Sequence, residues 1–244
     1  ATPTAGSVKI DGSNLGSALA GTIAAKKISA NTTSGFSIVE YVGVSSDTST
    51  VAHGLGVAPD LVMVKRLDTS AYWIVGSPEL GTDTYPRDVY LNDTSAEQND
   101  QIWGGESTAS VFKIRSSTAV NASSGEYIAY CFNSIEGYSK VGSYEGNGST
   151  DGAFVYTGFS PAMVIIKNID DAQDWSIIDN KRPGYNEVDE ILSPNLNSDE
   201  DAGTALDFTS NGFKCRNGSD INNDAKTMIY IAFAESPFKT SNAR

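Results

Sequence analysis

The sequence is poor in the residues that most enzymes use for chemistry. It has one histidine and two cysteines in 244 residues. A Ser-His-Asp hydrolase would have to use His53, and the sequence contains no Gly-x-Ser-x-Gly motif. One histidine and two widely separated cysteines also leave too few of the usual ligands for a zinc site. We therefore expect a protein that is not an enzyme and has no catalytic residues, metal ion or cofactor, with His53 in a structural or solvated role.

Two cysteines are too few for a disulfide framework. Cys131 and Cys215 fall at different positions of the two repeats described below. A bridge between them would have to cross from one repeat to the other. We expect two buried free thiols, because unpaired cysteine often behaves as a small hydrophobic residue.

Long apolar segments and positive charge are scarce as well. No run approaches the roughly 20 apolar residues that cross a bilayer. The start, Ala1-Thr2-Pro3-Thr4, lacks the basic and apolar regions of a signal peptide. Lysine and arginine total 17 against 30 aspartates and glutamates, which gives a net charge of -13. Because this charge would repel a phosphate backbone, we expect no nucleic-acid partner and no membrane insertion.

An internal repeat is the strongest positive signal in the sequence. The segment from Val57 to Val75 aligns with the segment from Phe159 to Ile177 without gaps. The identical pairs are Pro59 and Pro161, Val62 and Val164, Lys65 and Lys167, Asp68 and Asp170, and Trp73 and Trp175. The match resumes between Val111–Arg115 and Gly212–Arg216, and again between Tyr127–Phe132 and Met228–Phe233. A repeat of domain length indicates a duplicated domain, not a short solenoid unit.

Each repeat has the pattern of short β-strands. Leu61–Lys65 and Met163–Lys167 are apolar runs typical of buried strands. A proline stands shortly before each run, where it costs no ladder hydrogen bond. Turn-forming residues such as those at 68–71 follow. Short strands separated by Gly, Asn, Asp and Ser indicate a sandwich or barrel.

Residues 1–34 differ from the repeats because they contain no aromatic residue and are rich in Ala, Gly, Ser and Thr. Ser13–Ser29 has a weak helical pattern that Gly16 and Gly21 interrupt. We interpret residues 1–34 as a short N-terminal tether or assembly segment, with a disordered tail as the alternative. The predicted architecture is all-β: this tether, a first β-sandwich module at 35–138 and a second at 139–244, both jelly-roll or lectin-like.

Four segments carry a resemblance to a known family: His53–Arg66, Glu126–Lys167, Leu206–Lys214 and Ile231–Lys239. They are similar to a recurrent module of tailed bacteriophages, common in viruses of marine bacteria and cyanobacteria, that occurs in tail fibres and other virion structural proteins. The resemblance covers nearly all of residues 36–244 and leaves the first 35 residues outside. It implies a location on the virion, a lectin-like sandwich as described for some members, and no catalytic residues.

Aromatic side chains that occur in only one repeat are candidate binding residues. Trp73 and Trp175 are equivalent, so a shared core explains them better. Trp103 lies in a Gly-rich segment, and neither it nor Tyr72 nor Tyr85 has an aromatic counterpart. Flat rings stack on sugars and anchor interfaces. We predict these three unmatched aromatics as ligand- or partner-binding residues, with packing inside its own module as the alternative for Trp103.

Acidic and amide-rich loops offer two weaker hypotheses. Asp199–Asp201 could contribute to the carboxylate pair of a glycan depolymerase, although a solvated loop is the simpler interpretation. Asn147–Gly152 and Asn217–Asp220 offer oxygen ligands for calcium. Neither has the EF-hand spacing, and both are rich in turn formers. We predict no metal site.

The expected function is that of a non-enzymatic virion structural protein in a surface appendage, such as a tail fibre, a head fibre or a capsid decoration. Its expected partners are other virion proteins, further copies of itself, with a trimer favoured by analogy to viral fibres, and a host-surface glycan or protein. Weak sites in many copies would give such an appendage high avidity. The alternative is a secreted or surface carbohydrate-binding module, because β-sandwiches host many functions.

Overall fold

The fold is almost entirely β. The computed structural model describes residues 7–15, 21–81, 86–182 and 186–237. Strands make up the regular structure of these ranges, apart from a short 3-10 helix, η1 (Asp220–Asn222). The prediction of an all-β fold is confirmed. Within the described ranges, no helix has the length and apolar character needed to span a membrane.

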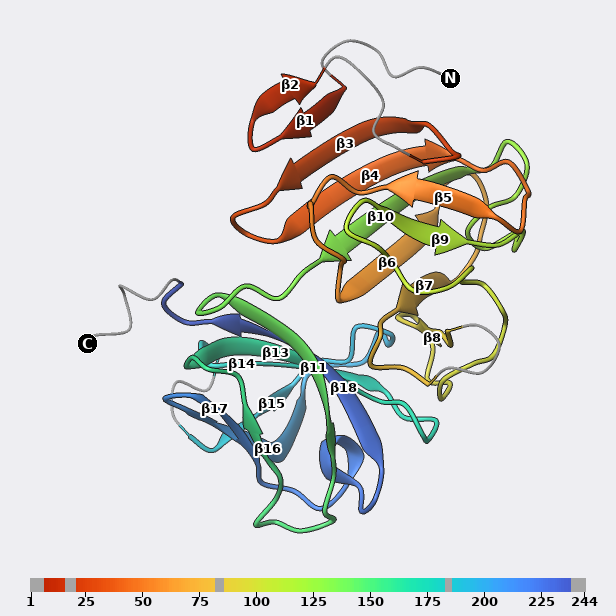
Figure 1. Ribbon diagram of the computed structural model, residues 1–244. Helices are drawn as coiled ribbons and strands as arrows, with labels where there is room; N and C mark the ends of the chain where they lie inside the picture. The colour runs from red at the N-terminus through yellow and green to blue at the C-terminus, as the bar shows by residue number, and fades with distance from the viewer. Residues whose placement is uncertain (1–6, 16–20, 82–85, 183–185, 238–244) are drawn as a thin grey trace. The chain divides into compact units, whose positions relative to one another are not determined.

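The chain divides into two compact units. Unit 1 comprises the residues up to Leu91 together with Glu97–Asn133. Unit 2 comprises Asn92–Ala96 together with the residues from Ser134 onward. Figure 1 shows the strands of unit 1 from red to green and those of unit 2 from green to blue. The short segment Asn92–Ala96 therefore belongs to unit 2, although its sequence neighbours on both sides belong to unit 1.

The main sheet of unit 1 has eight strands in the order β2-β1-β3-β4-β10-β6-β7-β8. Neighbouring strands are antiparallel except β1 and β3, which are parallel. Buried and half-buried residues alternate along β4, as expected of a strand with one face on the core. The strands are β1 (Val8–Ile10), β2 (Ser13–Leu15), β3 (Ala25–Asn31), β4 (Phe36–Val42), β6 (Leu61–Arg66), β7 (Trp73–Gly76), β8 (Val89–Tyr90) and β10 (Glu126–Phe132).

A smaller sheet of unit 1 lies against this main sheet. It consists of β5 (Ser49–Ala52) and β9 (Val111–Ile114), and single bridges add Ile23 at one edge and Trp103 at the other. Figure 1 shows β5 and β9 in front of β4, β10 and β6. The buried core of unit 1 takes side chains from both sheets, including Phe112 of β9.

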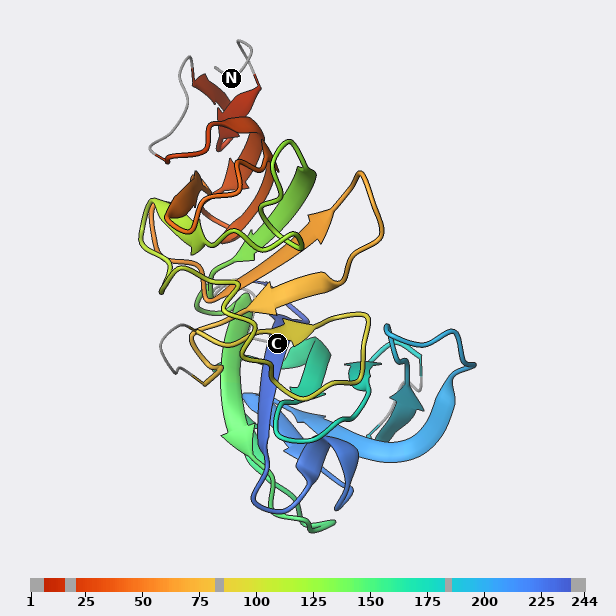
Figure 2. The ribbon, with the colours of Figure 1, turned by 90° about the vertical axis from the view of Figure 1, so that its right-hand side faces the viewer.

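Unit 2 contains two four-stranded sheets. Their orders are β11-β18-β13-β14 and β12-β17-β16-β15, and its core takes side chains from both. Figure 2 shows β16 as a long, curved strand, and its pairing with β15 contains a register shift. The strands are β11 (Ser139–Glu145), β12 (Phe154–Tyr156), β13 (Pro161–Asn168), β14 (Trp175–Asp179), β15 (Val188–Ile191), β16 (Asp201–Thr209), β17 (Gly212–Cys215) and β18 (Thr227–Ala234).

The two units share a strand order. The order β4-β10-β6-β7 in unit 1 corresponds to β11-β18-β13-β14 in unit 2. The registers agree as well, because Lys65 pairs with Trp73 and Lys167 pairs with Trp175. These are residues that the sequence repeat aligns. The strands predicted around the two lysines are confirmed as β6 and β13.

The repeated lysine has a structural role in both units. Lys65 Nζ donates a hydrogen bond to the carbonyl of Ala71 at 2.5 Å, and Lys167 Nζ donates to that of Gln173 at 2.6 Å. Each bond closes the turn between two neighbouring strands, of which one carries the lysine and the other the tryptophan. Lys167 also donates to Thr94 O at 2.9 Å, which holds the segment Asn92–Ala96 on unit 2. Burial lowers the pKa of Lys167 to about 8.

A buried asparagine anchors the same turn in each unit. Asn121 Oδ1 accepts a hydrogen bond from the backbone N–H of Val44 at 2.8 Å. Asn222 Oδ1 accepts one from the backbone N–H of Asn147 at 3.2 Å. Both asparagines are fully buried, so their amides satisfy backbone groups that water cannot reach.

The helical interpretation of Ser13–Ser29 is wrong. The described residues of this segment contain β2 and most of β3, and they contain no helix. β3 pairs with β4 in the main sheet, and its Ala25, Ile28 and Ala30 are buried in the core of unit 1. Part of the predicted tether is therefore a strand of unit 1. Residues 1–6 and 16–20 lie outside the described residues.

Candidate functional site

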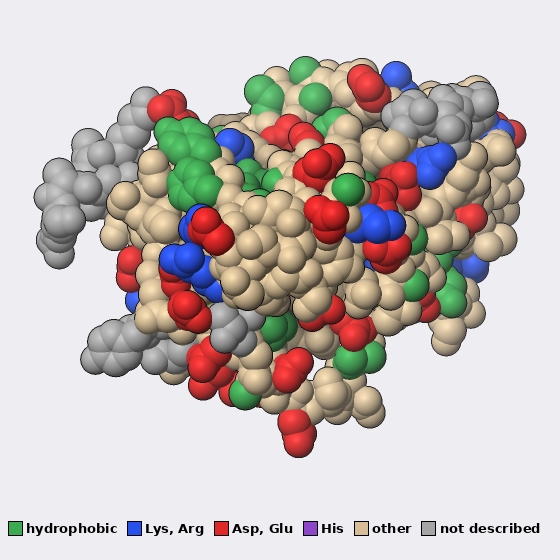
Figure 3. Space-filling model, turned by 90° about the horizontal axis from the view of Figure 1, so that it is seen from below, with side chains coloured by type: hydrophobic (Ala, Val, Ile, Leu, Met, Phe, Trp, Pro, Cys, Tyr) green, Lys and Arg blue, Asp and Glu red, His purple; other side chains and the backbone are tan. Residues whose placement is uncertain are grey.

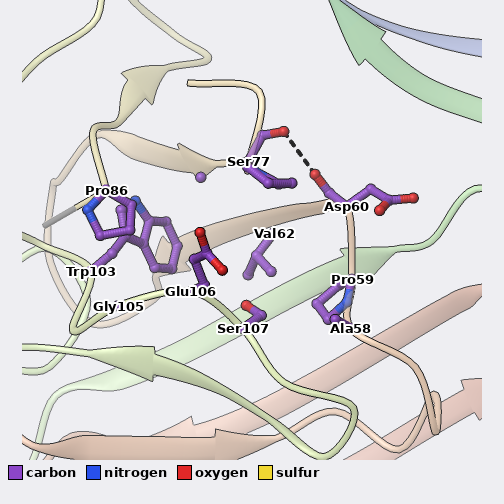
Figure 4. Close-up of a pocket in the computed structure, with 12 residues that line it drawn as sticks. Ala58, Pro59, Asp60, Val62, Ser77, Pro86, Trp103, Gly105, Glu106 and Ser107 are labelled. Atoms are coloured by element: carbon purple, nitrogen blue, oxygen red, sulfur yellow. Dashed lines mark hydrogen bonds between the residues drawn. The ribbon is translucent and has the colours of Figure 1, made fainter. Parts of the chain in front are cut away.

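A cavity of about 150 Å³ opens in unit 1 beside Trp103 (Figure 4). Its walls come from the residues before and within β6, the end of β7 with the residues that follow it, and the segment around Trp103. The lining residues are Ala58, Pro59, Asp60, Val62, Gly76, Ser77, Pro78, Pro86, Trp103, Gly105, Glu106 and Ser107. Most of these side chains are apolar and a few are polar, which is typical of a ligand-binding site.

The indole of Trp103 forms one wall of the cavity. Trp103 is only 5% exposed and belongs to the core of unit 1. Its ring packs directly on Gly76, because a Cβ atom on Gly76 would lie 2.4 Å from Cε2 of the indole. Real atoms do not approach so closely, so any side chain at position 76 would displace the indole. Figure 4 shows Trp103 on one side of the cavity, with Ala58, Pro59 and Asp60 on the other.

Unit 2 fills the corresponding place differently. The strand registers make Ile178 the counterpart of Gly76 and Leu206 the counterpart of Trp103. Both Ile178 and Leu206 are fully buried in the core of unit 2. Unit 1 therefore has a glycine and a tryptophan where unit 2 has an isoleucine and a leucine. Both Gly76 and Trp103 line the cavity.

Polar groups line the opposite side of the cavity. Ser77 Oγ donates a hydrogen bond to the backbone carbonyl of Asp60 at 2.8 Å, which ties the end of β7 to the residue before β6. The side chain of Asp60 is half-buried and accepts a long hydrogen bond from Asn133 Nδ2 at 3.5 Å. Figure 4 shows the Asp60 carboxylate pointing away from Trp103 and Val62, so it does not face the cavity.

Glu106 places its carboxylate at the exposed side of the cavity. In the part of the chain that the structure describes, Glu106 forms no ion pair. The side chain of Lys113 lies close to this loop, since its Nζ would be 3.8 Å from a Cβ atom on Gly105. Lys113 is not among the lining residues. Among the described lining residues, the carboxylate at the cavity is therefore that of Glu106, and none of these residues is basic.

The three predicted aromatic residues do not form one site. Trp103 lines the cavity, but its ring is a core wall and not an open stacking platform. Tyr72 is 47% exposed, stacks on Tyr90 at 4.5 Å between ring centroids, and is not in the cavity lining. The hydroxyl of Tyr90 in turn donates to Asp100. Tyr85 lies outside the described residues.

His53 closes a turn inside unit 1. The backbone N–H of Leu55 donates to Nδ1 at 3.2 Å, and Nε2 lies 3.0 Å from the carbonyl of Thr108. The ring is therefore neutral with its proton on Nε2, and burial lowers its pKa. The strand registers make Thr157 its counterpart in unit 2, where the backbone N–H of Phe159 donates to the Thr157 hydroxyl at 3.4 Å.

Asp88 has a carboxyl group whose pKa is strongly raised. It lies in unit 1 just before β8, and its side chain is buried. Burial, reinforced by the neighbouring Asp100 carboxylate, raises the pKa of Asp88 to about 7. Asp88 is not part of the cavity lining.

The oxygen atoms considered as calcium ligands converge on an amide group instead. Asn222 Nδ2 donates to Asn147 Oδ1 at 3.0 Å, to Ser149 O at 2.8 Å and to Asn217 O at 2.7 Å. This buried amide occupies the place that a cation would take among those oxygens. Among the described residues, no group of three or more His, Cys, Asp and Glu side chains is arranged to hold a metal ion.

The remaining candidates also lie apart from the cavity. Asp199–Asp201 belong to unit 2, where Glu200 forms an ion pair with Arg182, so these carboxylates are not in the lining of the unit 1 cavity. Cys131 and Cys215 are free thiols in the cores of units 1 and 2, as expected. Burial raises the pKa of Cys215 to about 11.

A protein-family model matches residues 10–237 of the chain. The chain belongs to this family, described as Domain of unknown function (DUF7483). The family match spans both units and includes β3, which the N-terminal interpretation had placed outside the modules. No curated protein and no solved structure matches the chain.

Most residues of the cavity could not be found from the sequence of this family member alone. Asp60, Ser77 and Glu106 are common surface residue types, and nothing in their spacing marks them. One signal was available: Gly76 aligns with Ile178 in the gapless part of the repeat. A glycine opposite a buried isoleucine indicates that another group packs closely on this position in the first copy, as the Trp103 indole does.

Proposed function

We propose that the chain is a non-enzymatic structural protein of a virion surface appendage, and that it contacts a partner through the Trp103 cavity of unit 1. In this proposal each unit is one copy of a tandem β-sandwich module of jelly-roll or lectin-like type. The resemblance of four segments to modules of tailed bacteriophages supports the location. The shared strand order of the two units supports the duplication.

One observation carries the binding role: the two units differ at the cavity. Ile178 and Leu206 lie in the core of unit 2, whereas in unit 1 the Trp103 indole packs on Gly76 and forms a wall of the cavity. The glycine and the tryptophan give this part of unit 1 a different shape from the same part of unit 2. We take the cavity beside the indole as the binding site of unit 1. Unit 2 then serves as the scaffold copy.

The chemistry of the lining supports binding without catalysis. Among the described residues, the lining offers the Glu106 carboxylate, two serine hydroxyls and apolar walls, and it contains no histidine, cysteine or lysine. His53 is held in its neutral form within a turn of unit 1 and is not in the lining. The cavity thus has groups that recognise a ligand but no activated nucleophile with an adjacent base.

The location is tested by mass spectrometry of purified virus particles and by electron microscopy with gold-labelled antibodies against the chain. We expect the chain in the particles at a copy number of several per particle, with the label at the surface. Finding the chain only outside the particles would refute the location.

A carbohydrate-binding module is the second candidate function. It is favoured by the Glu106 carboxylate and the serine hydroxyls of the lining, because a few polar groups in a cavity can hydrogen-bond a polar ligand such as a sugar. A simple measurement distinguishes the two candidates. The first predicts that the protein is found with the virus particles, and the second predicts that the free protein binds a sugar.

A further inference from the structure

We infer that the Trp103 cavity of unit 1 receives the side chain of a lysine or arginine from a partner protein. This inference deepens the proposed function, since it names the chemistry of the partner at the same site. It rests on the size of the cavity, on its apolar walls, on the Glu106 carboxylate at its exposed side and on the burial of the indole face.

The size of the cavity fits one side chain. Its volume of about 150 Å³ is below the roughly 300–1,000 Å³ of pockets that enclose a drug-sized ligand. An oligosaccharide or a folded segment would extend well beyond it. A single long side chain can enter from the exposed side, where Ala58, Pro78 and Glu106 lie.

The walls of the cavity suit an apolar stem. Trp103, Val62 and Pro59 are buried and present carbon atoms to the cavity. Lysine and arginine carry three or four methylene groups that pack on apolar surface while the charged end stays near water. Because the face of the indole packs on Gly76, the ring offers a wall for such a stem and not a platform for stacking a sugar.

The charges of the cavity select a cation. Glu106 places its carboxylate at the exposed side of the cavity and forms no ion pair within the described residues, and none of the described lining residues is basic. A cationic group whose stem enters the cavity would find this carboxylate as a partner, whereas a phosphate or a sialic acid would meet a negative charge. The net charge of -13 also attracts basic partners. Figure 3 shows acidic side chains spread over the face that it displays, with fewer basic ones.

The test uses the indole N–H signals of the full-length protein in two-dimensional NMR. The chain has three tryptophans, and a Trp103→Phe variant identifies the signal of Trp103. The probes are Nα-acetyl-lysine N-methylamide and the arginine equivalent. The matched probe without a charge is Nα-acetyl-norleucine N-methylamide, and methyl glucoside represents a neutral sugar.

We expect the lysine and arginine probes to shift the Trp103 signal with a dissociation constant on the order of 1 mM, a usual affinity for a ligand of this size. The norleucine probe should bind several-fold more weakly. Glu106→Gln should weaken lysine binding by about 2- to 5-fold, the range of a partly exposed ion pair. Glu145→Gln removes the same charge from an exposed position of unit 2 and should change nothing.

A second pair of variants tests the location without changing charge. Ala58→Trp places a bulky ring at the exposed edge of the cavity and should abolish the shift. Ser160→Trp makes a comparable change at the position of unit 2 that the repeat aligns with Ala58, and should leave binding intact.

Two results would overturn the inference. If no probe shifts the Trp103 signal at concentrations well above 1 mM, the cavity is not a site for basic side chains, although the particle location could still hold. If methyl glucoside shifts the signal and Glu106→Gln has no effect on lysine binding, the ligand is a sugar and the second candidate function gains. Absence of the chain from particles would refute the location alone and leave a measured lysine site standing.

Discussion

At the scale of single residues, Asp88 makes the clearest prediction about pH. Its pKa is about 7 in the folded protein against 3.8 in the unfolded chain. Between these values the folded state binds more protons, so stability falls as pH rises from about 4 to 7. This difference in pKa corresponds to about 4 kcal/mol of unfolding free energy at most. Asp88→Asn should therefore gain stability relative to the natural protein as pH rises, by a few kcal/mol between pH 4 and pH 8.

The measurement is urea denaturation of both proteins across this range. Asp224→Asn, at an exposed position of unit 2, is the control and should show no such trend. An Asp88→Asn variant whose relative stability is the same at pH 4 and pH 8 would contradict the burial of a raised-pKa carboxyl at this position.

His53 predicts a dependence of the opposite sign. Its pKa is lowered on folding. Below about pH 6.5 the unfolded chain therefore binds more protons than the folded protein, and stability falls as the pH falls. His53→Asn keeps an acceptor for the backbone N–H of Leu55 but does not titrate. The variant should be less stable than the natural protein at pH 7.5, and the gap should narrow at pH 5. Thermal melting at the two pH values measures this, and a gap that widens at pH 5 would show that the imidazolium is favoured in the fold.

Sequence patterns identified individual residues unevenly. The unmatched aromatics pointed to Trp103, which lines the cavity, but also to Tyr72, which does not. The role of Asn222 was not predictable, because its amide contacts Asn147 and Ser149, more than 70 residues earlier in the chain. Oxygen-rich turns indicate a cation or a donor equally well, and only the fold shows which group lies among them.

At the scale of elements, the end of β7 determines the cavity wall. A Cβ atom on Gly76 would overlap the Trp103 indole at 2.4 Å. Gly76→Ala should therefore destabilise the protein by about 1–3 kcal/mol, the usual cost of overpacking, and should change the fluorescence of Trp103. Chemical denaturation followed by tryptophan emission measures both effects.

The control for this change is another strand glycine. Gly203→Ala in β16 introduces a Cβ atom with no other atom within 4 Å and should be nearly neutral. Equal effects of the two substitutions would mean that the loss of glycine in a strand, and not the contact with Trp103, determines the cost.

Strands with long apolar runs were the easiest elements to predict. Both β6 and β13 are apolar and recur in the two copies, and a proline precedes β6 and begins β13, so three independent signals agreed. β3 was missed because its buried residues are two alanines and an isoleucine among lysine and serine. Such a weak alternation indicates a strand only once β4 is present as a partner.

At the scale of the whole molecule, the two units correspond in some features and differ in others. The units share a strand order, a lysine that closes a turn and a buried asparagine. They differ where Gly76 and Trp103 replace two aliphatic side chains. The sequence repeat predicted the shared features because equal residues occupy equal places. It could not predict the cavity, which depends on how side chains from three separate segments meet.

The central claim is that unit 1 contacts a partner on a virus particle through the Trp103 cavity. High-resolution electron microscopy of intact particles tests it most directly. The account predicts the chain in a surface appendage, with a lysine or arginine side chain of a neighbouring protein in the cavity and its charged end beside Glu106. Particles in which the chain is present and the cavity of every copy faces open solvent, or particles without the chain, would contradict it.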